Sequence, residues 1–159
     1  MSQTPDPRFS TTQILDMRQR LEFLSRLQKV INRIHGAANV DEIMLEVSPD
    51  LCQVFEADRL TIYMVNDERS AIVSKVKTGL HAFKDLKLPI SESSIAGYVA
   101  MTQKLMNLHD VYDEAELARH SPRMFFLKEV DKRTGYRTKQ TLVAPILSDK
   151  DRELLGVVQ

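Results

Sequence analysis

The stretch LPISESSIAGYVAMTQKLMNLHDVYD, Leu88–Asp113, changes its local pattern twice within one short segment and decides the fold. It opens on the end of KLPI (Lys87–Ile90), whose composition is that of a short strand. SESSIAGYVAMTQK predicts a short helix, because the hydroxyl of Ser93 or Ser94 can accept a hydrogen bond from the free N–H groups of the first turn. LMNLHDVYD predicts a second strand that runs into a loop.

Two predicted hairpins flank this segment. Upstream, RLTIYMV (Arg59–Val65) and AIVSKVKTG (Ala71–Gly79) change to a period of two around a turn-like Asn-Asp pair. Downstream, TKQTLVAPILSD (Thr138–Asp149) and ELLGVVQ (Glu153–Gln159) form the second hairpin. The sequence between Leu88–Asp113 and the second hairpin is polar and irregular, and we expect a short helix there.

That short helix is placed around Pro122–Val130, inside the irregular segment Glu114–Arg133. The complete order is then two helices, three strands, a helix, a strand, the irregular segment and two strands. This order predicts an α+β fold in which helices cover an antiparallel sheet.

The N-terminal part predicts one long helix with two apolar stripes. Residues 1–10, which include two prolines, predict a flexible leader, and the helical pattern covers residues 11–36. The first stripe has the alternating three-and-four spacing of a coiled coil and comprises Ile14, Met17, Leu21, Leu24, Gln28 and Ile31. The second comprises Leu27, Val30 and Ile34. We expect the helix to pack on its own domain and on a second copy, as a homodimer through residues 14–34. The alternative is one wide stripe in a monomer.

A second amphipathic helix is predicted after Asn39, with a kink or break at Pro49 because proline cannot continue the hydrogen-bond ladder. Cys52, the single cysteine, lies near its apolar face, which favours a buried structural thiol over a reactive one.

The composition narrows the class of protein. The chain has 159 residues, 43% of them hydrophobic, and 22 basic residues balance 22 acidic ones, so no overall field attracts nucleic acid or anionic lipid. One cysteine excludes an internal disulfide and a multi-cysteine zinc site. No apolar run has the length of a membrane span, so we expect a cytoplasmic protein without membrane insertion.

Motifs of catalysis are not found in the sequence, so no enzymatic activity is predicted. Walker, dinucleotide-binding, nucleophile-elbow and zinc-protease patterns are missing, and the four histidines lack metal-ligand spacing. His109-Asp110 is the one histidine with an adjacent carboxylate, and we interpret the pair as polar residues at a strand end. The basic cluster Lys128–Lys139 contains Glu129 and Asp131 and one aromatic residue, which does not favour a nucleic-acid site.

Binding of a small molecule is better supported. The predicted helix start at Ser93, Ser94, Ile95 and Ala96 offers free N–H groups and a positive dipole end to a phosphate or carboxylate. We place a pocket between Ser91–Gly97 and the loop Asp131–Thr138, both rich in hydroxyl groups. Simple helix capping and a solvent-facing loop are the alternatives.

Three motifs in this order, LPISESSIAGYVAMTQKLMNLHDVYD, EVDKRTGYRTKQTLVAPI and ELLGVVQ, resemble the GAF domain, above all the GAF domains of cyclic-nucleotide phosphodiesterases and adenylyl cyclases. The resemblance covers Leu21–Gln159. It implies a six-stranded antiparallel sheet with the N-terminal helices on one face and a ligand pocket on the other, and parallel dimers through the first helix. The family's role is regulatory, which implies an output domain in the same full-length chain.

The resemblance also implies site residues. Positions that match Ile95 and Ala96 offer N–H groups to a cyclic phosphate, and Asp131, Thr134 and Thr138 match ligand contacts. The position of Thr61 lies near the base. Three departures argue against a cyclic nucleotide: Lys77 and Thr78 replace an aromatic and acidic pair, and Leu127 replaces a tyrosine.

We expect no metal, haem or bilin. Bilin-binding members need a cysteine at the chromophore, whereas Cys52 lies on the second helix. The GAF unit is assigned to residues 37–159, and because ELLGVVQ ends in an open strand we expect it to be truncated at its C-terminal end. Two functions follow. The first is a sensory domain that binds a nucleotide-like or anionic ligand. The second is a ligand-free dimerisation and docking module, of a secretion or pilus-assembly ATPase for example, with Phe125, Phe126 and Leu127 filling the pocket.

Overall fold

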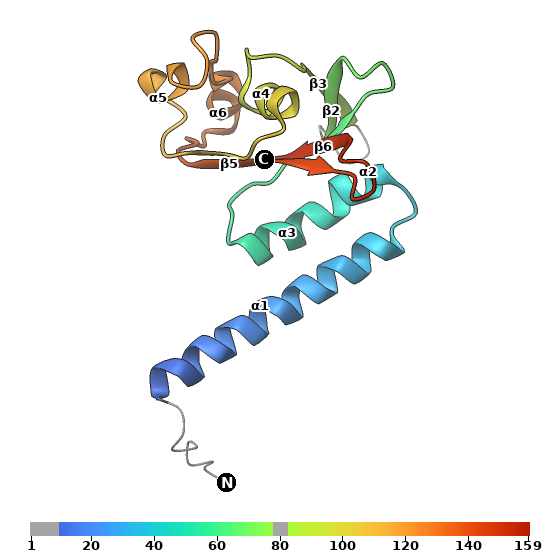
Figure 1. Ribbon diagram of the computed structural model, residues 1–159, viewed down its shortest axis with the longest axis vertical. Coiled ribbons are helices and arrows are strands. Elements are labelled where there is room, and N and C mark those ends of the chain that lie inside the picture. The colour runs from blue at the N-terminus through green and yellow to red at the C-terminus, as the bar shows by residue number, and fades with distance from the viewer. Residues whose placement is uncertain (1–9, 78–82) are drawn as a thin grey trace. The chain divides into compact units, whose positions relative to one another are not determined.

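The computed structural model describes residues 10–77 and 83–159, so most of the predicted leader at residues 1–10 lies outside the described residues (Figure 1). The described chain forms two compact units, one up to Arg59 and one from Leu60 to Gln159. Each is described by itself. The predicted placement of the N-terminal helices on one face of the sheet stays a prediction.

Helix α1 runs over Thr11–Gly36, as the sequence predicts, and starts at a complete capping box. The Ser10 side chain accepts a hydrogen bond from the Gln13 N–H at 3.2 Å, and the Gln13 side chain accepts one from the Ser10 N–H at 2.9 Å. These two bonds satisfy N–H groups that have no partner within the helix. The start of α1 is therefore fixed by its own sequence.

The second predicted helix is divided, as expected from Pro49. It consists of α2 (Val40–Glu42), a π-helical turn η1 (Ile43–Val47) and α3 (Ser48–Phe55). Pro49 lies in the first turn of α3, where a missing N–H costs nothing, so the interruption precedes the proline.

A small apolar core holds the N-terminal unit together. Val30 of α1 packs with Val47 and Val54, and four partly buried side chains surround them: Leu27, Ile34, Ile43 and Leu51. The predicted stripe Leu27, Val30 and Ile34 thus packs inside its own unit.

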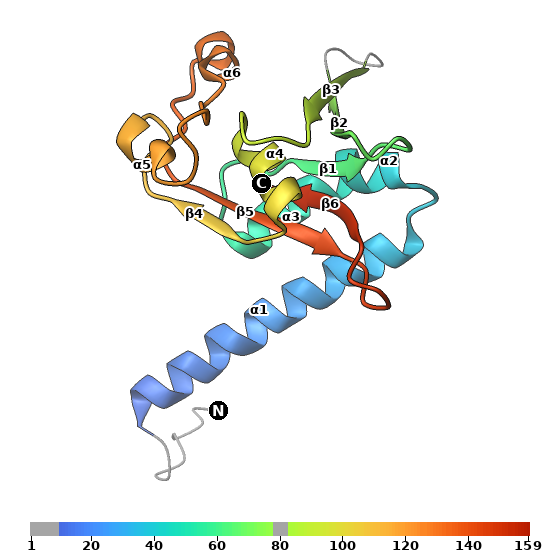
Figure 2. The ribbon, with the colours of Figure 1, turned by 45° about the horizontal axis from the view of Figure 1, so that its top comes forward.

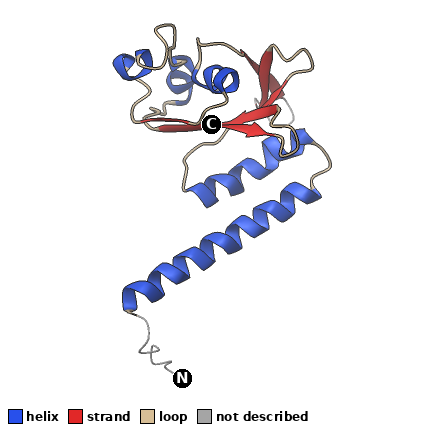
Figure 3. Cartoon of the chain, in the orientation of Figure 1, coloured by secondary structure: helices blue, strands red, loops and turns tan. Residues whose placement is uncertain are grey.

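The second unit is built on a six-stranded, fully antiparallel sheet, which confirms the predicted fold class. In chain order the strands are β1 (Ile62–Val65), β2 (Ala71–Lys77), β3 (Phe83–Pro89), β4 (Met106–Leu108), β5 (Thr141–Leu147) and β6 (Leu154–Val158). Their order across the sheet is β3-β2-β1-β6-β5-β4. The helices are α4 (Ile95–Thr102), α5 (Glu114–Ala118) and α6 (Lys128–Thr134), which lie on the same side of the sheet (Figures 1 and 3).

The register of the sheet places its apolar residues on the face that α4 covers. Tyr63 of β1 lies opposite Val157 of β6, and Ile72 of β2 lies opposite Leu88 of β3. These four side chains share one buried cluster with Val99 of α4, which is fully buried. Because side chains alternate between the faces of a strand, these pairs fix which face each neighbouring residue occupies.

Gly156 lets β1 and β6 approach each other. A Cβ atom at this position would lie 2.2 Å from the Tyr63 carbonyl oxygen, closer than any side chain tolerates. The central strand pair therefore requires glycine here.

The helix predicted around Pro122–Val130 is wrong in position. Helix α6 begins at Lys128, and the separate α5 lies upstream, where Asp113 caps it by accepting hydrogen bonds from the first N–H groups. The residues before α6 use their backbone groups in contacts outside a helix: the Phe125 N–H donates to the Ser93 carbonyl oxygen at 3.1 Å. The described residues contain no helix long and apolar enough to cross a bilayer.

Candidate functional site

The start of α4 contains four of the predicted site residues. Ser94 is the N-cap, and its hydroxyl accepts a hydrogen bond from the Gly97 N–H at 3.1 Å. Ser93 shares a hydroxyl–hydroxyl hydrogen bond of 2.8 Å with Ser91. Ile95 and Ala96 are buried, at 4% and 1% exposure. Ser94 therefore has the role of a helix cap, which is the alternative to ligand binding given above. The start of the helix is closely packed.

Asp131 is the buried centre of the other predicted segment. It is 5% exposed, and its carboxylate accepts hydrogen bonds from the Tyr112 hydroxyl at 3.0 Å, the Thr138 N–H at 2.6 Å and the Thr138 hydroxyl at 2.8 Å. The Thr134 hydroxyl reaches the Asp131 carbonyl oxygen at 3.4 Å. Asp131, Thr134 and Thr138 thus come together, and the carboxylate joins α6 to the segment that enters β5.

Tyr112 links this carboxylate to an aromatic and cationic cluster. Its ring lies 5.4 Å from the Phe126 ring, 4.4 Å from the Arg137 guanidinium and 5.3 Å from the Lys128 ammonium. Burial, followed by the hydrogen bond to Asp131, raises the pKa of Tyr112 above its ordinary value. The hydroxyl is therefore a stable donor to Asp131 at neutral pH.

The segment between α5 and α6 connects the two groups of predicted residues. Ser121 is buried and donates a hydrogen bond to the Glu92 carboxylate at 3.0 Å, and Arg123 forms an ion pair with Glu92 at 3.3 Å. Further along, Phe126 packs against the main core next to Tyr112. The contacts therefore run without a break from the start of α4 to Asp131.

Of the three side chains expected to fill a pocket, Phe126 alone packs on the core. Phe125 is 52% exposed and Leu127 is 37% exposed. The alternation of buried and exposed residues along this segment resembles a strand rather than the predicted helix, which explains why the side chains point in opposite directions.

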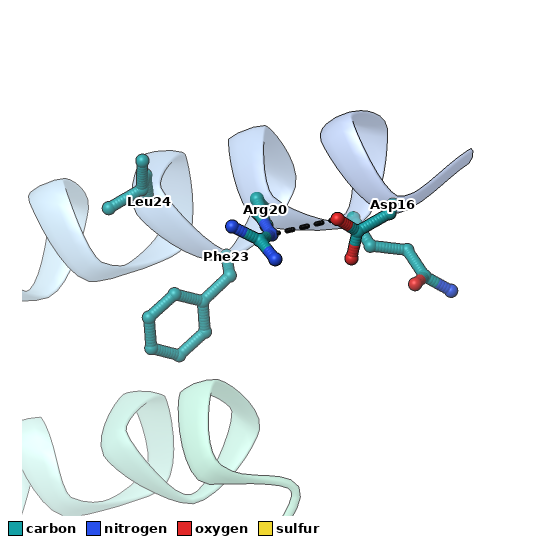
Figure 4. A pocket seen from close by; sticks show the side chains of 5 residues that line it. Asp16, Arg20, Phe23 and Leu24 are labelled. Carbon is teal, nitrogen blue, oxygen red and sulfur yellow. Dashed lines mark ion pairs between the residues drawn. The ribbon is translucent and has the colours of Figure 1, made fainter. Parts of the chain in front are cut away.

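The described surface has a shallow hollow beside Asp131. It is lined by Tyr112, Asp131, Lys132, Gly135, Tyr136 and Arg137. Residues of Ser91–Gly97 do not line it, so the structure divides the predicted pocket into a packed helix start and an open hollow. A second shallow hollow lies along α1, where Asp16 and Arg20 form an ion pair of 3.0 Å next to Phe23 and Leu24 (Figure 4).

Thr61 lies just before β1 and extends the ladder between β1 and β6. It exchanges two backbone hydrogen bonds with Gln159, of 2.7 and 2.9 Å. The alternation along the strand puts Thr61 on the same face as Tyr63, which faces α4. Thr78 and the side chain of Lys77, two of the three departures from the family pattern, lie outside the described residues.

Sequence reasoning missed Glu116, which organises the loop after β4. It is 7% exposed, and its carboxylate accepts hydrogen bonds from the N–H groups of His109 and Asp110, both at 3.0 Å, and contacts the His109 ring at 3.2 Å. The two backbone hydrogen bonds lower the pKa of Glu116 to about 2. The Asp110 carboxylate instead contacts Tyr112 and Arg137, so His109 and Asp110 do not form a dyad.

Metal and thiol chemistry receive little support from the described residues. They contain no group of three His, Cys, Asp or Glu side chains that could hold a metal ion. Cys52 is half-buried, and burial followed by the Asp58 charge raises the pKa of its thiol, which favours the neutral form.

A model of the GAF domain matches residues 39–159, and the chain belongs to the GAF domain family. GAF domains are regulatory units.

The chain is similar to parts of two much longer relatives. It is 26% identical over 136 residues to the probable 3',5'-cyclic phosphodiesterase pde-5 of Caenorhabditis elegans, covering 79% of this chain and 17% of that protein. It is 26% identical over 141 residues to the dual 3',5'-cyclic-AMP and -GMP phosphodiesterase 11A of Takifugu rubripes, covering 82% of this chain and 14% of that protein.

Solved structures agree on the fold. The GAF domain of a phosphoenolpyruvate-protein phosphotransferase from Coxiella burnetii superposes with a TM-score of 0.62 at 20% identity, over 87% of this chain and 76% of that one. The corresponding domain from Acinetobacter gives a TM-score of 0.58 at 15% identity, over 86% and 74% of the two chains.

Glu116→Gln tests the anchor of the β4–α5 loop. The folded-state pKa of about 2 lies below the ordinary value of 4.5, so this carboxylate stabilises the fold above pH 4.5 and loses that effect as the pH falls towards 2. We expect the free energy of unfolding of E116Q to be lower than that of the parent protein at pH 7. Between pH 4.5 and 2 it should fall less steeply than that of the parent protein. Urea denaturation at a series of pH values measures both effects.

The matched control is Glu114→Gln on the same helix, because the Glu114 side chain is 85% exposed and meets Lys128 only at 3.5 Å. E114Q should follow the parent protein at each pH. An E116Q curve parallel to the parent curve would show that the loop does not depend on this charge.

Asp131→Asn tests the buried carboxylate. The amide nitrogen cannot accept a hydrogen bond, so Tyr112 or Thr138 loses its acceptor, and we expect the free energy of unfolding to fall by about 1–3 kcal/mol. Urea denaturation measures it, and Glu129→Gln, an exposed acid on the same helix, should change it by less than about 0.5 kcal/mol. Equal stability of the two variants would contradict the role of Asp131.

Proposed function

We propose that the chain is the sensory part of a larger regulatory protein, which binds a nucleotide-like or anionic small molecule and signals to an output module. The observation that carries the proposal is the continuous set of contacts from Ser93 through Phe125 and Phe126 to Tyr112 and Asp131. In this proposal the ligand rearranges these contacts when it binds. It would then bind one arrangement more tightly than the other, which is what a signal requires.

The charges around this region favour an anionic ligand. Lys132 and Arg137 line the hollow, and the positive dipole end of α4 begins at Ser94. The Asp131 carboxylate also lines the hollow, so an anionic ligand requires Lys132 and Arg137 to outweigh its negative charge. The candidate contacts are Ser93, Ser94, Ile95, Ala96, Asp131, Thr134 and Thr138, with Thr61 near the base.

The relatives named as cyclic-nucleotide phosphodiesterases support a nucleotide-like ligand. The chain spans only 17% and 14% of their lengths, so their catalytic activity is not transferred to it. The proposal is a non-catalytic domain that acts in the cytoplasm on an output domain of its own full-length chain.

A homodimer through α1 would carry the signal. The a/d stripe contains Met17, Leu21 and Leu24, which are 47%, 67% and 56% exposed in the single chain. Gln28 occupies an a position of the same stripe. In a parallel dimer it meets Gln28 of the second copy, whereas an antiparallel pairing sets it against apolar residues, so the stripe favours the parallel arrangement.

The second candidate is a ligand-free dimerisation and docking module. Phe126 packs on the core between the two groups of predicted site residues, and this packing is what a permanently filled pocket would show. In that case α1 and the surface carry the function.

Ligand titration separates the two functions. Cyclic AMP, cyclic GMP, AMP, GMP and inorganic phosphate are the probes, measured by calorimetry and thermal denaturation. Sensing predicts that one of them binds and, at a hundredfold excess over its Kd, stabilises the fold by about 2.7 kcal/mol. Lys132→Ala should weaken binding several-fold, and Lys150→Ala, an exposed lysine in the β5–β6 turn, should leave it unchanged. An unresponsive parent protein would favour the docking module.

The double variant Leu21→Glu, Leu24→Glu tests the dimer. It places charges in the apolar stripe, and sedimentation equilibrium should show a monomer where the parent protein is a dimer. Arg26→Glu, which makes the same change in net charge at the f position facing away from the stripe, should leave the dimer intact. A parent protein that sediments as a monomer would contradict the proposed dimer through α1.

A further inference from the structure

The chain is neutral overall, yet its charges are strongly separated along the sequence. Arg119–Lys139, the basic segment, has seven lysines and arginines against two acids, a net charge of +5. Val40–Asp58, the acidic segment, has six acids and no lysine or arginine, a net charge of −6. The two segments together carry −1 and the rest of the chain carries +1, so the neutral chain contains two oppositely charged regions that can attract each other.

Folding changes the charge that the basic segment presents. Three of its cations form ion pairs with acids from outside the segment: Arg123 with Glu92, Lys128 with Glu114 and Arg137 with Asp110. Of its two acids, Asp131 is buried and hydrogen-bonded to Tyr112 and Thr138, whereas Glu129 is exposed. The cations Arg119, Lys132, Arg137 and Lys139 are exposed. Of the two acids that lie among the basic residues in the sequence, only Glu129 is therefore exposed at the surface.

Apolar side chains lie among these cations. Phe125 and Leu127 are 52% and 37% exposed, next to Arg123 and Lys128. Apolar anchors with a charged surround are the usual composition of a protein–protein contact. A polyanion without apolar groups would pair with the cations and leave Phe125 and Leu127 uncovered. The surface is therefore better suited to an acidic protein segment that carries an apolar side chain of its own.

The acidic segment has this composition. Glu46 and Glu56 are exposed, and Phe55, at the end of α3, is 59% exposed. Arg33 of α1 forms an ion pair with Asp50 of this segment. Glu46 and Glu56 therefore offer the charge opposite to that of the basic segment, and Phe55 offers an apolar partner for Phe125 and Leu127.

We propose that the basic segment of one copy binds the acidic segment of a second copy. The contact joins two different surfaces, so it is heterologous and can link α1 dimers into larger assemblies. It does not use the a/d stripe of α1. Because its attraction acts between exposed charges, it weakens as the ionic strength rises.

Charge reversal tests the proposal with two variants of the whole chain. One removes the positive charge of the basic segment, taking it from +5 to −1 with Arg119→Glu, Lys132→Glu and Lys139→Glu. The other removes most of the negative charge of the acidic segment, taking it from −6 to −1 with Glu46→Lys, Gln53→Lys and Glu56→Lys. These side chains are exposed. Sedimentation velocity at 50 and 500 mM NaCl measures assembly, and circular dichroism checks that each variant is folded. The same pair of variants is also prepared with Leu21→Glu and Leu24→Glu, which isolates this contact from the α1 dimer.

The parent protein should form species larger than its α1 dimer at 50 mM and lose them at 500 mM salt. Each variant should fail to assemble alone, whereas an equimolar mixture should assemble again, since the intact acidic segment of the first variant then meets the intact basic segment of the second. A parent protein without salt-dependent assembly would overturn the proposal. So would a mixture that does not assemble, which would assign the basic segment to another acidic partner or to a contact within one chain.

Discussion

Asp131 is a buried carboxylate, and such a group is tolerated only if the protein supplies hydrogen bonds in place of water. Three donors from two residues do so, the Tyr112 hydroxyl and both the N–H and hydroxyl of Thr138. This requirement positions the end of the β4–α5 loop, the axis of α6 and the start of β5 at once. Figure 2 shows α5 beside β4 and β5 at that end of the sheet, with α6 beyond. The aromatic and cationic contacts of Tyr112 then follow from its fixed hydroxyl.

The sheet was predictable because its signals are local. Alternating residues such as those of RLTIYMV and TLVAPIL, and the Ser-rich start of α4, each determine structure over a few positions. The failure lies between Glu114 and Thr134. There, α5 depends on one capping side chain, Asp113, and the segment before α6 takes its shape from the Ser93 carbonyl oxygen. Contacts between residues far apart in sequence decide that region, and periodicity does not report them.

The candidate site shows the same division. The hydroxyl cap of Ser94 was visible in the sequence, and so was the clustering of Asp131, Thr134 and Thr138. The burial of Asp131 was not, because a carboxylate in a run of lysines and arginines has the appearance of a surface residue. Glu116 was missed for a related reason. Its acceptors serve the N–H groups of a loop seven residues away, and a glutamate in a short acidic stretch gives no sign of that role.

Helix α1 has one half fixed and one half free within its unit. Val30 and its neighbours hold the C-terminal half on a small core, whereas the other end starts at the capping box of Ser10 and leaves Met17, Leu21 and Leu24 exposed. At about 1.5 Å per residue, the 26 residues form a rod of roughly 39 Å. A rod anchored at one end magnifies small rotations: a tilt of about 10° at Val30 moves the far end by several ångströms over that length. The apolar stripe at the free end is thus the place where a small rearrangement of the core becomes a large displacement.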